Sequence, residues 1–60
     1  MSKVFDDFYF RAIKVLETTA KETGYEAEFL VSVLDEMLED GESPIDAVSH
    51  IVGVALEGDF

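Results

Sequence analysis

Three glycines divide this chain into three stretches of helical periodicity, and this punctuation constrains the fold more than any other feature. Gly24, Gly41 and Gly58 each follow such a stretch, and glycine often ends a helix because it adopts the left-handed backbone conformation without steric cost. In the segment "SPID", Ser43 suits an N-cap and Pro44 suits the first helical position. No alternation typical of strands is found. The sequence therefore predicts an all-α fold, with helices over about 3–23, 26–40 and 44–57.

The loops between these helices are short, so neighbouring helices are expected to fold back on one another as a small three-helix bundle. Ser2 is expected to cap the first helix. With sixty residues and no cysteine, the chain is expected to form a single domain, residues 1–60, without disulfides. A domain of this size buries only about 60% of its unfolded surface. Very good helix packing, self-association or a partner is therefore expected to support it.

The segment "FDDFYFRAI" in the first helix carries four of the seven aromatic residues. At 100° per residue, Phe5, Phe8 and Tyr9 fall on the apolar face together with Val15, and we expect them in the core. Phe10 falls among charged side chains. Phe10 is therefore expected to lie outside the core of the bundle. Three alternatives remain for what contacts it: lysine side chains of the same helix, a second subunit, or a partner for which it acts as an anchor.

The second helix is acidic on the side opposite its apolar face, and it contains no base. Like charges at i,i+4 cost a few tenths of a kcal/mol each, and acids near a helix C-terminus oppose the helix dipole. One interpretation is that these carboxylates only keep the protein soluble. The other is that they bind a basic surface of a partner, with Phe29 at the border as a second exposed aromatic anchor. The residues of this acidic face are Glu28, Asp35, Glu36, Glu39 and Asp40.

The charge of the whole chain supports a basic partner. Fourteen acids and four bases give a net charge of −10, and no lysine or arginine follows Lys21. Binding to nucleic acid needs clustered bases, so direct binding of DNA or RNA is not expected. The expected partner is a larger protein with a basic surface, and a protein that itself binds nucleic acid would be one example.

The third helix is apolar over more than half of its circumference, which is more than one side of a bundle requires. It is therefore expected to be central or covered by a second subunit, and a homodimer is expected. Ser49 and Gly53 would allow another helix to approach the edge of this face. The residues predicted for self-association are Val48, Ile51, Val52 and Ala55.

Nothing in the sequence indicates catalysis, a cofactor or a metal site. His50 lies near Asp46 and Glu57, but a metal site needs three or four ligands, so His50 is expected to face solvent. No nucleophile–base arrangement or phosphate-binding loop is present. No apolar run approaches the ~20 residues that span a bilayer, and Asp6 and Asp7 interrupt any export signal. We expect a cytoplasmic protein that is not an enzyme and does not enter membranes.

Two resemblances bear on function. The order helix–"TGY"–helix–helix is similar to ubiquitin-associated domains, whose first loop carries Met-Gly-Phe/Tyr. Gly24 and Tyr25 match this motif, while Thr23 replaces the methionine and the first helix is longer. The resemblance implies a ubiquitin- or peptide-binding module. The corner at Gly41 resembles a helix-turn-helix, but its second helix lacks the bases of a DNA reader. Neither assigns the chain to a family.

Three functions are therefore considered. The leading hypothesis is a small acidic modulator or inhibitor that binds a basic surface of a larger protein. By analogy, it would resemble the nucleic-acid mimics and anti-defence proteins that phages and mobile elements encode, and it would then act in the host cytoplasm. The first alternative is a structural or assembly subunit that acts through apolar helix contacts. The second is the ubiquitin- or peptide-binding module.

Overall fold

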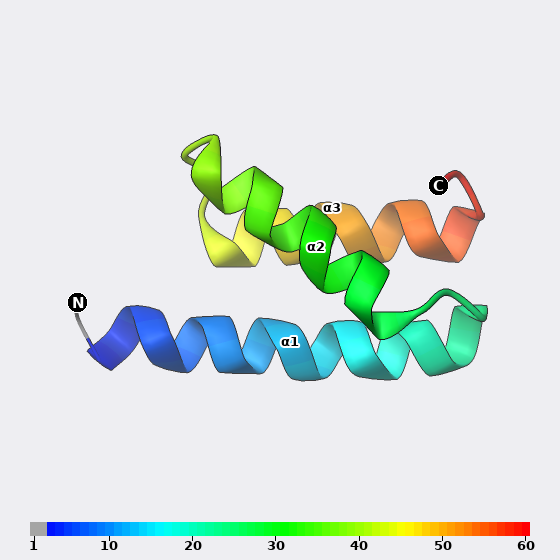
Figure 1. Ribbon diagram of the computed structural model, residues 1–60, viewed down its shortest axis with the longest axis horizontal. Coiled ribbons are helices and arrows are strands. Elements are labelled where there is room, and N and C mark those ends of the chain that lie inside the picture. Colours follow the sequence, from blue (N-terminus) through cyan, green and yellow to red (C-terminus); the bar gives the residue numbers. More distant parts are fainter. Residues whose placement is uncertain (1–2) are drawn as a thin grey trace.

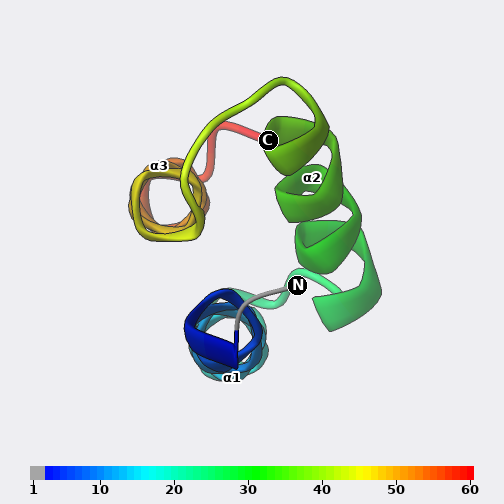
Figure 2. The same cartoon turned by 90° about the vertical axis from the view of Figure 1, so that its left-hand side faces the viewer.

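In the computed structural model, which describes the backbone of residues 3–60 and the side chains of residues 7–60, the chain forms three helices. These are α1, Lys3–Thr23, α2, Ala27–Glu39, and α3, Pro44–Glu57. The helices α1 and α3 lie side by side and run in roughly the same direction, and α2 returns at a slant across both (Figures 1 and 2). Every pair of helices is in contact. The prediction of a small all-α three-helix bundle is confirmed.

The helix ends follow from local chemistry. Gly24, Gly41 and Gly58 have φ angles of 88°, 96° and 74°, which lie in the region that a β-carbon disfavours. The Ser43 hydroxyl caps α3 by accepting a hydrogen bond from the backbone N–H of Asp46 at 3.2 Å. The predicted bounds of the first and third helices agree with the structure, whereas α2 is one residue shorter at each end. The expected Ser2 cap lies outside the described residues.

The core is formed by leucine and isoleucine side chains separated by alanines. Leu16, Leu30, Leu34 and Ile51 are fully buried. The helices α1 and α3 bury the same pattern of a small, a large and a small side chain at intervals of four residues, which places each set on one helix face. Alanine has a short side chain, so a neighbouring helix can pack near its backbone. The two sets are Ala12, Leu16 and Ala20 on α1, and Ala47, Ile51 and Ala55 on α3.

The first helix buries a narrower face than the sequence predicted. Phe8 is 37% exposed and Val15 is 46% exposed, so their placement in the core was wrong. The packed strip of α1 is formed by Ala12, Leu16 and Ala20. Phe8 continues this strip by one turn toward the N-terminus and Val15 lies at its side, and both line an open groove between α1 and α3. Tyr9 is half-buried against the core. The side chain of Phe5 lies outside those described.

The surface of α3 beside Gly53 is open within one chain, so the approach of another helix to Ser49 and Gly53 stays a prediction. A β-carbon placed on Gly53 would meet no atom within 4 Å in the described part of the chain. Within one chain, the close packing of α3 therefore involves its alanines and not Gly53. Among residues 3–60, no helix is sufficiently long and apolar to cross a bilayer.

The chain end contributes a contact that no helical pattern indicates. The ring of Phe60 packs edge-on against two aromatic rings, with ring centroids 5.5 Å from Tyr25 and 5.3 Å from Phe29. Edge-to-face pairs at such distances are favourable because the positive edge of one ring meets the negative face of the other. The three residues after α3 therefore fold back onto the start of α2.

Candidate functional site

The predicted acidic face is exposed in the structure. Glu28, Asp35, Glu36 and Glu39 lie on α2, and Asp40 is the residue that ends it. At 100° per residue, Glu28, Asp35 and Glu39 share one side of α2, whereas Glu36 and Asp40 lie further around the helix. Neither α2 nor α3 contains a lysine or an arginine. The charge of this face is therefore not balanced by bases on its own helix or on α3.

One of these carboxylates is held in place by the neighbouring helix. The hydroxyl of Tyr9 on α1 donates a hydrogen bond to Oδ1 of Asp35, at 2.7 Å. This hydrogen bond raises the pKa of Tyr9 above its usual value, because the ionised phenolate could not donate it. Partial burial and the charge of Asp35 act on the pKa of Tyr9 in the same direction. The contact fixes the position of Asp35 relative to α1.

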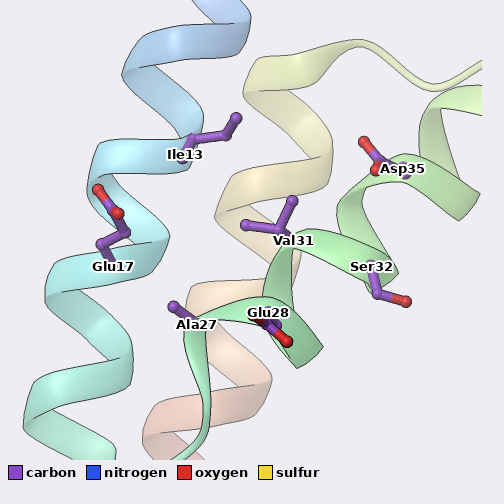
Figure 3. A pocket seen from close by; sticks show the side chains of 7 residues that line it. All are labelled: Ile13, Glu17, Ala27, Glu28, Val31, Ser32 and Asp35. Atoms are coloured by element: carbon purple, nitrogen blue, oxygen red, sulfur yellow. The ribbon is translucent and has the colours of Figure 1, made fainter.

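A groove between α1 and α2 contains apolar and acidic side chains together. It has a volume of about 320 Å³, and Figure 3 shows Ile13 and Val31 directed into the space between the two helices. Glu17 lies on the α1 side, and Glu28 and Asp35 lie on the α2 side. We call this the α1–α2 groove. It is lined by Ile13, Glu17, Ala27, Glu28, Val31, Ser32 and Asp35.

Sequence reasoning missed Glu17 as a candidate site residue. Glu17 lies on the polar side of α1 on a helical wheel, and nothing in the pattern of one helix indicates which polar residues a second helix will approach. The available signal was weak. Glu17 follows Ile13 by one helical turn on α1, and Glu28 adjoins Ala27 on α2. Each acid therefore lies next to an apolar residue, and the fold brings these two apolar residues into one groove.

A second groove lies between α1 and α3, and its lining residues include no acid. It has a volume of about 190 Å³. Ile45 is 55% exposed beside it, and Arg11 is its one charged lining residue. We call this the α1–α3 groove. It is lined by Phe8, Arg11, Ala12, Val15, Pro44, Ile45 and Val48.

The structure separates the residues predicted for self-association into two groups. Ile51 and Ala55 are 0% and 3% exposed, so they belong to the core of the single chain and not to its surface. Val48 and Val52 are half-buried and pack against that core. Of the four residues, Val48 lines the α1–α3 groove. An apolar surface for self-association would therefore consist of the residues that line the α1–α3 groove.

The two predicted aromatic anchors have different surroundings. Phe10 is 65% exposed, as its position on the polar side of α1 indicates. Phe29 is 44% exposed, but it also packs against Phe60 and lies 6.3 Å from the ring of Tyr25, between ring centroids. Phe10 is thus the more exposed of the two rings.

His50 is exposed on α3. Within the described residues, no three histidine or carboxylate side chains are grouped so that they could hold a metal ion.

No protein-family model, curated protein or solved structure matches the chain. The similarity to ubiquitin-associated domains therefore rests on Gly24, Tyr25 and the order of the helices.

Proposed function

We propose that this protein binds a basic surface of a larger protein through the acidic face of α2 and thereby modulates or inhibits it. The observation that carries the proposal is that the carboxylates of this face are all exposed while α2 and α3 contain no lysine or arginine. Such carboxylates repel one another, and Glu39 and Asp40 also lie at the negative end of the helix dipole. A cationic partner would relieve both effects.

The charge distribution supports a protein as the partner. The four bases of the chain lie within its first 21 residues, so α2 presents a surface that attracts cationic groups and repels phosphates. Inhibitors and nucleic-acid mimics encoded by phages also present compact acidic surfaces, and this analogy supports the class of function without naming the target. We place this activity in the cytoplasm.

Reversing three charges of the acidic face tests the proposal. The purified protein is used to capture proteins from the cells that produce it, and the affinity of each captured protein is then measured directly. The variant E28K/D35K/E39K is expected to bind about tenfold more weakly or worse, because an exposed ion pair contributes about 0.2–1 kcal/mol and three are reversed. Raising the salt concentration should weaken the wild-type complex as well.

The matched control is E42K/E57K/D59K, which makes the same change in net charge at three exposed positions outside α2. Its affinity is expected to change less than that of the α2 variant. Equal losses in the two variants would show that overall charge and not the acidic face determines binding. Full binding by the α2 variant would contradict the proposal directly.

The α1–α3 groove supports a second candidate, namely an assembly subunit that forms homodimers. The observation in its favour is that Phe8, Val15 and Ile45 are exposed around a groove without acids. Because no acid lines this groove, two copies with a charge of −10 each would not bring lining carboxylates together there.

Light scattering after size-exclusion chromatography tests the homodimer. The wild-type protein is expected to be dimeric at micromolar concentrations, and I45K is expected to be monomeric, because the substitution would bury an unpaired charge in the contact. L56K serves as the control, since Leu56 is exposed on the same helix but does not line the groove. A monomeric wild-type protein would exclude this second candidate.

A further inference from the structure

The α1–α2 groove combines an apolar floor with acidic residues around it, and both helices contribute to each part. Ile13, Ala27 and Val31 form the floor, and Glu17 on α1 and Glu28 on α2 also line the groove, although their carboxylates do not point at each other in Figure 3. The volume of about 320 Å³ lies at the lower end of the range of about 300–1,000 Å³ that is usual for ligand pockets. The groove is therefore of a size that suits a side chain more than a large cofactor.

We infer that the α1–α2 groove binds an arginine or lysine side chain of the partner, from a basic amphipathic segment. Both side chains place a long aliphatic stem along apolar surface while they keep the charged head near water or a counter-ion. In this groove the stem would lie on Ile13, Ala27 and Val31, and the head would lie among Glu17, Glu28 and Asp35. The inference rests on the proposed function, since it states which group of the basic partner enters and where.

Charge complementarity selects this occupant over others. A purely apolar side chain would cover the floor but would remove water from nearby carboxylates without replacing their hydrogen bonds, which is unfavourable. An anionic group would be repelled by Glu17, Glu28 and Asp35. A cation with an apolar stem would cover the apolar floor and would also pair its charge with the carboxylates.

The contact between Tyr9 and Asp35 prepares one side of the groove. Oδ1 of Asp35 accepts the hydrogen bond of Tyr9 at 2.7 Å, and a carboxylate has a second oxygen with further capacity to accept. Because the position of Asp35 is already restricted, less conformational entropy is lost when a cation binds to it. An arginine guanidinium, with several donors in one plane, can reach more than one of the carboxylates that line the groove.

Isothermal titration with synthetic peptides tests the inference. One probe is an amphipathic helical peptide of leucine, alanine and arginine, and the comparison probe has glutamine at each arginine position. The wild-type protein is expected to bind the arginine peptide about tenfold or more tightly than the glutamine peptide, since three charge-assisted contacts are available. Equal binding of the two peptides would overturn the inference together with the proposed function.

The decisive variants alter the groove itself. E17Q/E28Q neutralises one carboxylate on each helix, and both residues are exposed, so the fold should be retained. Its affinity for the arginine peptide is expected to fall about tenfold. V31T keeps the shape and the charge of the groove but adds a hydroxyl to its floor, and a loss of about threefold is expected. E42Q/E57Q makes the same change in charge as E17Q/E28Q outside the groove and is expected to bind as the wild type does.

A further variant separates failure of this inference from failure of the proposed function. E36Q/E39Q neutralises two carboxylates of the acidic face that do not line the groove. If it weakens binding as much as E17Q/E28Q does, and V31T has no effect, the acidic face binds cations generally and the groove inference is overturned. If E17Q/E28Q and V31T both weaken binding more than E36Q/E39Q does, the groove is the site. Circular dichroism spectra of all variants are needed to check that each is folded.

Discussion

Replacing Leu34 by alanine is expected to lower the free energy of unfolding by about 2–5 kcal/mol, which is the usual range for removing a buried leucine side chain. Leu34 lies on α2, has no exposed surface and belongs to the core cluster that joins all three helices. Small domains typically have a total stability of about 0.05–0.15 kcal/mol per residue. For sixty residues, this single substitution would remove a large part of the total.

Urea denaturation followed by circular dichroism measures this effect. The matched control is L56A, because it makes the same leucine-to-alanine substitution at a position that is 62% exposed. L56A is expected to alter the free energy of unfolding by no more than about 0.5 kcal/mol. Equal effects of L34A and L56A would contradict the arrangement of α2 against α1 and α3. If L34A is unfolded even without urea, its helical circular dichroism signal should be absent, whereas L56A should keep that signal.

The sequence was sufficient to predict the helices because their ends depend on local chemistry. Positive φ angles at Gly24, Gly41 and Gly58 and the cap formed by Ser43 involve only nearby residues. The placement of Phe8 and Val15 failed because it depends on where another helix lies. Helical periodicity gives the direction of the apolar face of α1, but the width of the buried strip depends on how α2 and α3 pack against it.

The candidate site was predicted in part. The exposure of the carboxylates on α2 follows from the periodicity of that helix alone. The presence of Glu17 and Glu28 in one groove, the hydrogen bond from Tyr9 to Asp35 and the packing of Phe60 on Phe29 all involve residues that are distant in the sequence. They depend on how the helices cross, and no local pattern encodes that angle.

The helix α2 connects stability with the proposed function. Its buried face supplies Leu30 and Leu34 to the core, while its exposed carboxylates repel one another. The helix is therefore held in place by the burial of its apolar side chains and not by its surface charges, as is usual for helices within proteins. This division allows Glu28 or Glu36 to be changed without loss of the fold, so the binding experiments above report on recognition.

Replacing Ala47 by leucine is expected to lower the free energy of unfolding by about 1–3 kcal/mol, because extra methylene groups in a packed core force side chains and backbone to shift. Ala47 has no exposed surface and lies on α3 among core residues that include Ala12 and Leu16 of α1. A larger side chain at this position would have to separate α3 from its neighbours. Thermal and urea denaturation of A47L measure the loss.

The control for this prediction adds volume to α3 where there is open space. A β-carbon on Gly53 would meet no atom within 4 Å in the described part of the chain, and Gly53 lies in the interior of the helix. G53A is therefore expected to raise the free energy of unfolding by about 0.5–1 kcal/mol, since alanine favours the helical conformation more than glycine does. A47L and G53A should thus change the free energy of unfolding in opposite directions, although both lie on α3. If A47L were as stable as the wild type, α3 would not be packed as closely at Ala47 as the structure places it, and the shared alanine pattern of α1 and α3 would lose its structural meaning.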